Sequence, residues 1–146
     1  IAKGFENSNI NLPVRSTKNS AGYDVEAAED CIIPAFKPGQ KPTLVKTGVK
    51  AYMQDGEVLV VVPRSGLGFK YYTRLANTLG VIDSDYYYSD NEGHIFAKIT
   101  NDSNENRTVN INAGEGFMQG IFIQYGITLD DDVTELRNGG FGSTTK

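Results

Sequence analysis

Short apolar runs, separated by turn-forming residues, recur along the chain at intervals of roughly 8 to 12 residues. This spacing indicates an all-β sandwich or barrel, and nothing between residues 31 and 62 requires a helix. The pattern predicts strands at residues 31–33, 43–49, 57–62, 80–82, 93–100, 108–112 and, with its turn, 114–123. A short edge strand is also expected at residues 9–13.

Two of these runs differ in how polar residues are placed. Residues 108–112 alternate between polar and apolar, which is typical of a half-buried strand. Residues 58–62 are apolar without alternation, which predicts a strand covered on both faces. From residue 137 onward the chain is rich in glycine and offers little to pack. We therefore expect one β domain over residues 1–136 and a flexible tail over residues 137–146.

Composition narrows the class of protein. A chain of 146 residues fits one domain with a core of its own. Its net charge of -4 argues against a nucleic-acid surface, because a phosphate backbone requires clustered Lys and Arg. A single cysteine, Cys31, excludes an internal disulfide, and no apolar run reaches the roughly 20 residues of a membrane-spanning helix. Since the sequence shows no charged-then-apolar leader, a cytoplasmic location is expected.

Residues 80–86, GVIDSDY, place two carboxylates and an aromatic ring directly after an apolar run. A carboxylate fixed at a strand end, here Asp83, can take a proton from water when a substrate lies beside it. The ring of Tyr86 offers a flat apolar face to a sugar or a base. The alternative interpretation is a surface turn, because Asp is common in turns.

Three further stretches carry candidate chemistry. Arg64, Ser65 and Gly66 combine a guanidinium, a hydroxyl and an approachable backbone, which suits phosphate, and a helical turn starting at Ser65 would add its positive end. A glycine-rich connection with an incidental arginine is the alternative. The amide of Asn77 can both donate and accept, as a uracil edge requires. Asp24 begins an acidic run that is either a solvated face or faces a hydrated divalent cation.

Residues 80–86 resemble the third motif of the trimeric dUTP pyrophosphatases (dUTPases) of bacterial or phage type. Four other segments match in the family's order: residues 21–24 (AGYD), 63–70 (PRSGLGFK), 114–119 (GEGFMQ) and 137–144 (RNGGFGST). Five motifs in order across one small domain argue against coincidence. The resemblance implies a jelly-roll-like β-barrel that forms a homotrimer with three sites at subunit boundaries. It also implies hydrolysis of dUTP to dUMP and pyrophosphate with Mg²⁺ as cofactor.

The same resemblance implies roles for individual residues. Asp83 would activate the water that attacks the α-phosphorus, and Tyr86 would lie against the deoxyribose. No side chain is expected to bind Mg²⁺ directly, and Asp24 would reach it through water. The tail over residues 137–146 would close over the site as a lid. The remaining substrate contacts are expected from Arg64, Ser65, Gly66, Asn77, Val81, Ile82, Phe96, Gln119, Arg137, Phe141, Gly142 and Ser143.

The chain departs from the family's pattern in two places. It carries extra residues between Tyr87 and Glu92, which leaves open whether Tyr86 or one of its neighbours packs on the sugar. Gly116 stands where the family usually has a basic residue. The only histidine, His94, is expected to point off a strand.

Two alternative functions remain open at this point. A dCTP deaminase shares the fold implied here, but it needs an acid–base residue such as Glu beside the cytosine amine. Asp83, Asn77 and the complete tail favour dUTPase. The other alternative is a regulatory protein that uses the dUTPase scaffold to hold a protein partner through the Tyr87–Glu92 loop. Neither a nucleic acid nor a membrane is expected as a partner.

Overall fold

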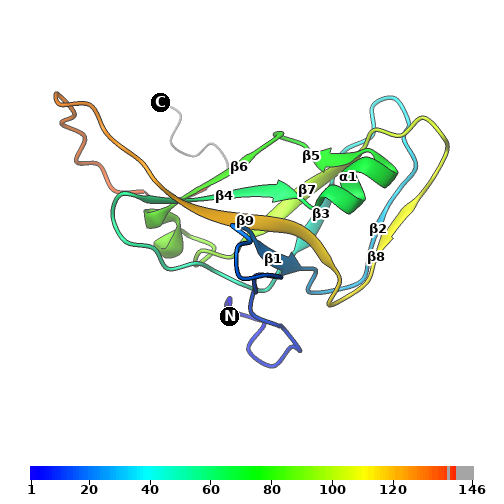
Figure 1. Ribbon diagram of the computed structural model, residues 1–146, viewed down its shortest axis with the longest axis horizontal. Coiled ribbons are helices and arrows are strands. Elements are labelled where there is room, and N and C mark those ends of the chain that lie inside the picture. Colours follow the sequence, from blue (N-terminus) through cyan, green and yellow to red (C-terminus); the bar gives the residue numbers. More distant parts are fainter. Residues whose placement is uncertain (138, 141–146) are drawn as a thin grey trace.

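The computed structural model describes residues 1–137 and 139–140, and its regular elements are mostly strands (Figure 1). The strands are β1 (Tyr23–Glu26), β2 (Cys31–Ile33), β3 (Thr43–Lys46), β4 (Glu57–Pro63), β5 (Thr73–Leu75), β6 (Gly80–Asp83), β7 (Phe96–Asn101), β8 (Val109–Ile111) and β9 (Gly116–Gln124). Two short helices interrupt them, α1 (Ser65–Tyr71) and the 3₁₀ helix η1 (Ser84–Tyr88). The expected all-β class is confirmed, and so is the helical turn beginning at Ser65.

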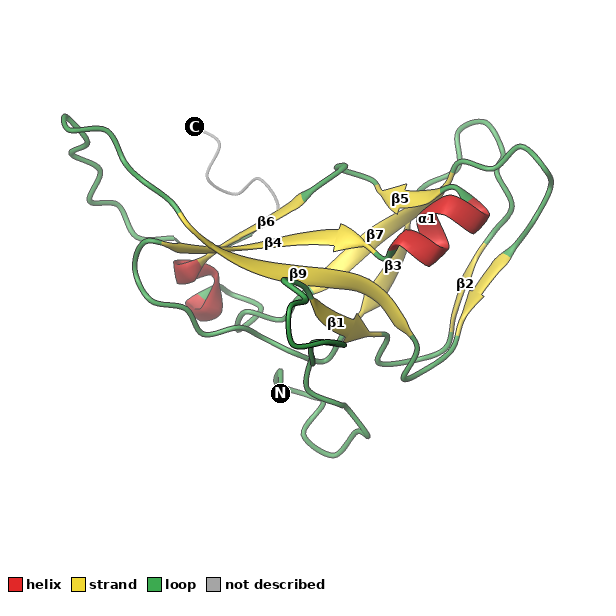
Figure 2. Ribbon diagram, viewed as in Figure 1, coloured by secondary structure: helices red, strands yellow, loops and turns green. Residues whose placement is uncertain are grey.

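The strands pair only in antiparallel fashion within the described chain and form three sheets. One sheet has the order β1-β9-β4-β6, another has the order β3-β7-β5, and β2 pairs with β8. Figure 2 shows the first sheet in front of the second, with the β2–β8 pair at one end. Most of these pairs join strands far apart in sequence, so the chain folds over itself as in a barrel.

One hydrophobic cluster fills the space between the sheets. Phe117 and Met118 of β9 and Leu59 and Val61 of β4 are buried in it, together with side chains from the other two sheets. Each fully buried side chain of this size contributes about 1.5–3 kcal/mol. The described chain therefore has one core, which all three sheets share.

β4 lies in the middle of the larger sheet and connects two places where polar residues gather. Near its start, Val58 pairs with Asp83 of β6. At its end, Pro63 pairs with Met118 of β9 and leads directly into Arg64 and α1. The two ends of one strand thus carry two groups of candidate site residues.

Several strand predictions need correction. The edge strand predicted at residues 9–13 is wrong, because these residues form no strand and only the next residue, Val14, makes an isolated bridge with Asp24. The strand from residue 43 ends at Lys46 rather than at 49, since the Thr47 hydroxyl donates to the Ile95 carbonyl and Gly48 has φ +69°. Residues 58–62 form a strand, but only Leu59 and Val61 are buried, and the alternate residues are half-buried.

Three elements were not predicted from the pattern. β1, β5 and η1 are short, and each has too few apolar positions to display a period. No helix of the described chain is long and apolar enough to cross a membrane.

Candidate active site

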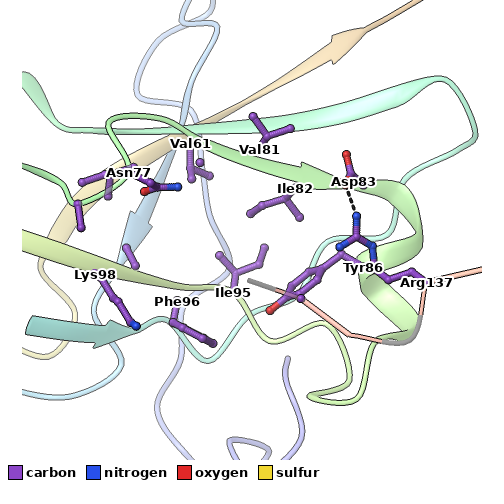
Figure 3. A pocket seen from close by; sticks show the side chains of 15 residues that line it. Val61, Asn77, Val81, Ile82, Asp83, Tyr86, Ile95, Phe96, Lys98 and Arg137 are labelled. Atoms are coloured by element: carbon purple, nitrogen blue, oxygen red, sulfur yellow. Dashed lines mark hydrogen bonds and ion pairs between the residues drawn. The ribbon is translucent and has the colours of Figure 1, made fainter. Parts of the chain in front are cut away.

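A pocket of about 530 Å³ opens at the end of β6, between that strand and β7 (Figure 3). Its lining includes Asn77, Val81, Ile82, Asp83, Tyr86, Phe96 and Arg137, all of which were predicted as site residues. The pocket also takes in Lys98 of β7 and Gly140. The cavity is large enough for a nucleoside.

Asp83 ends β6 at the rim of this pocket. Gly80 begins the strand because a Cβ there would come within 2.2 Å of the Val61 side chain, so only glycine lets β6 pair so closely with β4. Asp83 then takes the N-cap position of η1 in extended conformation, but its carboxylate makes no capping hydrogen bond. The carboxylate is about half exposed at the rim of the pocket.

Arg137 crosses the pocket mouth and pairs with both carboxylates of residues 80–86. Its guanidinium donates to Asp83, and Nε donates to Asp85 Oδ1 at 2.7 Å. Only 16% of the Arg137 side chain is exposed. Gly140 lies close to the Tyr86 ring, because a Cβ at Gly140 would be 2.7 Å from Cε2 of that ring. The start of the tail therefore lies against the pocket of its own chain.

Tyr86 lines the pocket with a ring that is also part of the core. Its side chain is buried, and its hydroxyl donates to the His94 carbonyl at 2.7 Å. Burial raises the pKa of Tyr86, and a hydrogen bond from Asn91 opposes that rise. The phenol is consequently neutral and fixed in place, and it presents a ring face to the pocket rather than a reactive group.

The opposite wall of the pocket is suited to the edge of a base. Asn77 donates through Nδ2 to the Leu79 carbonyl at 3.0 Å, which orients its amide. The Ala76 N–H donates to the Lys98 carbonyl at 2.8 Å. Because strand residues two apart direct their backbone groups the same way, the N–H and C=O of Phe96 point toward this edge as well.

A second cluster of predicted residues lies at the other end of β4. Arg64 Nε is 3.4 Å from Asp24 Oδ1, and Nη1 donates to the Gly116 carbonyl at 3.3 Å. A Cβ at Gly116 would come within 2.8 Å of that guanidinium, so Arg64 occupies the space that the missing basic residue would use. Ser16, which was not predicted, donates to the second Asp24 oxygen at 2.6 Å.

Gln119 and Gly66 complete this second cluster. Gln119 pairs with Asp24 in the β1–β9 register. The Gln119 amide lies against Gly22, because a Cβ at Gly22 would be only 2.3 Å from Gln119 Oε1. Around Gly66 an added Cβ would meet no atom within 4 Å, so the space beside the start of α1 is open. The first N–H groups of a helix have no intrahelical acceptor. Ser65 and Gly66 therefore offer backbone donors next to Arg64.

The two clusters cannot meet within one chain. Asp83 is opposite Val58 and Arg64 follows Pro63, so five residues of extended β4 lie between them and the two ends are about 20 Å apart. The pocket thus gathers Asp83, Tyr86, Asn77 and Arg137. The Pro63 end of β4 gathers Arg64, Ser65, Gly66, Gln119 and Asp24.

In the described part of the chain, no group of three or more His, Cys, Asp or Glu side chains could hold a metal ion. Asp24 keeps a partly exposed carboxylate between Ser16 and Arg64, which suits contact with a hydrated cation. The donor set fits an ion held mainly by ligand oxygens and water.

Four residues of the site were not predicted as site residues from the sequence, and three predicted ones lie outside the described chain. Asp85, Ser16, Asn91 and Lys98 carry site contacts that only the folded chain reveals, because their partners are distant in sequence or lie on other elements. Phe141, Gly142 and Ser143 lie outside the described residues, so their predicted contacts stay predictions.

The family model described as dUTPase matches residues 8–145. The deoxyuridine 5′-triphosphate nucleotidohydrolase of Lactococcus lactis subsp. lactis (strain IL1403) is 47% identical over 147 residues, covering 99% of this chain and 94% of that protein.

Solved structures show the same fold. The crystal structure of dUTPase from Streptococcus mutans matches with a TM-score of 0.70 and 44% identity, over 80% of this chain and 88% of that chain. A mutant dUTPase from phage phi11 of S. aureus, described with a structural Mg(II) ion, matches with a TM-score of 0.67 at 24% identity. That match covers 87% of this chain and 92% of the phage protein. The likeness confirms the predicted jelly-roll-like β-barrel.

Proposed function

Because this chain belongs to the dUTPase family, we propose that it hydrolyses dUTP to dUMP and pyrophosphate with Asp83 as the general base. The observation that carries the proposal is the pocket of about 530 Å³ with Asp83 at its rim and Asn77 on its wall. In a cell this reaction limits uracil in DNA and supplies dUMP for thymidylate synthesis. The predicted cytoplasmic location is part of the same proposal.

Asp83 acts on water rather than on the nucleotide. A water beside its carboxylate gives up a proton to it and attacks the α-phosphorus, and the bond from that phosphorus to the bridging oxygen breaks. Pyrophosphate leaves, and dUMP keeps the new oxygen. Arg137 neutralises Asp83 before substrate arrives. It must exchange this carboxylate for a phosphate oxygen before the base can work, which makes Arg137 a phosphate contact in the closed site.

Phosphate binding falls to the second cluster. Arg64, the hydroxyl of Ser65, the N–H of Gly66 and the amide of Gln119 would hold the triphosphate and stabilise the charge that develops on it. Asp24 would contact a Mg²⁺ ion through water. When bound, that ion neutralises phosphate charge.

The separation of the two clusters supports a homotrimer. Since Asp83 and Arg64 lie about 20 Å apart along β4, one chain cannot wrap both around a single triphosphate. Three copies around an axis would bring Asp83 of one subunit to Arg64 of the next and create three equal sites. The predicted lid, including Phe141, Gly142 and Ser143, would close each site.

Selection of the base and the sugar follows from the pocket walls. Asn77 and the backbone of Phe96 would bind the uracil edge, and Val81 and Ile82 would line the space beside it. A close strand there leaves no space for the thymine methyl group. The Tyr86 ring would lie flat on deoxyribose and clash with a 2′-hydroxyl.

The proposal is tested with purified protein, dUTP and Mg²⁺, with pyrophosphate and ammonia as readouts. Wild-type protein should release pyrophosphate from dUTP and no ammonia from dCTP. Asp83→Asn should still bind a non-hydrolysable dUTP analogue but lose about 10²-fold or more in turnover. Full turnover in Asp83→Asn would show that another group is the base.

The two alternative functions differ in how far they are supported. The family match and the named relative do not favour the dCTP deaminase. A protein partner at the Tyr87–Glu92 loop stays a prediction, and one observation is consistent with it. Tyr88 is 73% exposed and packs edge-on against Tyr87, with 5.1 Å between ring centroids. A pulldown that loses its protein when residues 87–92 are shortened would support such a partner.

A further inference from the structure

The loop of extra residues after Tyr86 folds back onto that tyrosine through Asn91. Asn91 Nδ2 donates to the Tyr86 hydroxyl at 2.6 Å and to the His94 carbonyl at 3.2 Å. Its Oδ1 accepts from the Ser89 hydroxyl at 2.8 Å and from the Gly93 N–H at 3.2 Å. One amide thus joins the loop to the far end of the ring that lines the pocket.

These contacts determine where the Tyr86 hydroxyl lies. It receives a hydrogen bond from Asn91 and donates its own proton to the His94 carbonyl at 2.7 Å. His94 immediately precedes Ile95 and Phe96 in the opposite wall of the pocket. The ring is therefore held between the loop and that wall, and its tilt depends on both bonds.

The loop itself is firmly built, so it can hold the ring. Glu92 and Gly93 are consecutive residues with positive φ, at +55° and +76°. A Cβ at Gly93 would lie 2.7 Å from Tyr87 Cα, which only glycine avoids. Glu92 also pairs with Lys3 at 2.7 Å, which ties the loop to the start of the chain.

We propose that Asn91 is a positioning residue that orients the Tyr86 ring and thereby increases selection of deoxyribose over ribose. The inference rests on the proposed function, in which this ring excludes the 2′-hydroxyl. Asn91 touches no substrate atom in this scheme. It acts by holding the Tyr86 hydroxyl in place.

Asn91→Asp isolates the donor groups of the side chain. The aspartate keeps an acceptor for Ser89 and Gly93 but loses the Nδ2 donors to Tyr86 and His94. The measurement is kcat/KM for dUTP and for UTP. Loss of the partly buried hydrogen bond to the Tyr86 hydroxyl predicts a fall of about fivefold in the dUTP/UTP ratio, mainly through a better KM for UTP.

Two companion variants make the result specific. Asp90→Ala alters the neighbouring loop residue, which is exposed and has no side-chain hydrogen bond in the described chain, and it should leave the ratio unchanged. Tyr86→Phe removes the hydroxyl and should lower the ratio about as much as Asn91→Asp. The double variant should be no worse than either single one. A wild-type ratio in Asn91→Asp, or additive losses in the double variant, would overturn the inference.

A crystal structure of Asn91→Asp gives a readout that does not depend on the substrate. The Tyr86 ring should be tilted or occupy two rotamers, whereas in Asp90→Ala it should keep one. An unmoved, single Tyr86 ring in Asn91→Asp overturns the inference even if the enzyme hydrolyses dUTP. Conversely, absence of pyrophosphate release from dUTP by the wild type refutes the proposed function. The orientation of the Tyr86 ring in the Asn91→Asp crystal structure then still tests whether Asn91 positions that ring.

Discussion

Acidification below neutral pH should destabilise the protein through its single histidine. His94 Nε2 accepts the Gly48 N–H at 3.1 Å, so the imidazole must be neutral at that nitrogen. The ring packs between Phe5 and Phe96, with centroids 4.9 and 6.0 Å away. Burial, helped by the charge of Lys46, lowers the pKa of His94 from its ordinary 6.5. The expectation that His94 merely points off a strand is therefore wrong.

The sign of the effect follows from the lowered pKa. In the unfolded chain His94 binds a proton as the pH falls through 6.5, while in the folded chain it resists protonation until a lower pH. The stabilisation is thus fully present above pH 6.5 and is lost as the pH falls toward the folded-state pKa. Protonation places an N–H against the Gly48 N–H, which costs about 1 kcal/mol. For a chain of this size that corresponds to about 2–4 °C in Tm.

The assay is thermal unfolding between about pH 7.5 and pH 5, a range in which histidine titrates. His94→Gln is the matched variant, because Oε1 can accept the Gly48 N–H and does not titrate. Wild type should lose Tm over this range, and the variant should lose less by the amount stated above. The NMR titration of the one histidine should give a midpoint below 6.5. Parallel pH profiles for both proteins, or a raised midpoint, would refute the reasoning.

Three other changes test separate parts of the structure. Gly22→Ala should push the Gln119 amide aside, because the new Cβ would lie 2.3 Å from Gln119 Oε1. The variant should lose about tenfold in turnover with little change in Tm, and unchanged turnover would contradict the role of Gln119. Gly93→Ala should lower the free energy of unfolding in urea by about 2–3 kcal/mol, given φ +76° and the backbone of Tyr87 at 2.7 Å, and a wild-type urea midpoint would be the opposing result. Chelation of divalent cations should abolish pyrophosphate release and added Mg²⁺ should restore it, whereas release that persists in chelator would argue against Mg²⁺.

The fold was predictable where the chain's pattern is strong. The long apolar run of β4 and the strands β2, β8 and β9 follow from the sequence because apolar residues gather there between turn-forming residues. The alternating burial along β4 does not follow, because every position from 58 to 62 is apolar. β1 was not predicted because only Val25 of its four residues is buried, so its acidic residues looked like part of a solvated face. The edge strand at residues 9–13 failed because Leu12 finds no place in the core and is 65% exposed.

The candidate site was predictable as residues but not as contacts. Motif order identified Asp83 and Tyr86, and amide chemistry identified Asn77; the fold brings all three to one pocket. No local pattern links Arg137 to Asp85, because the contact joins residues 52 positions apart and depends on the path of the chain after β9. The contacts of Asn91 were not predictable either, because its side-chain amide accepts a backbone N–H inside a loop that has no periodic pattern.

The central claim is that Asp83 of one subunit and Arg64 of another form one catalytic site for dUTP. Asp83→Asn and Arg64→Gln chains, each carrying a different affinity tag, are co-expressed, and trimers that carry both tags are isolated. Each variant alone should be nearly inactive. Every mixed trimer contains one boundary where an intact Asp83 meets an intact Arg64, so mixed trimers should show about one third of wild-type pyrophosphate release. Mixed trimers as inactive as the single variants would contradict it.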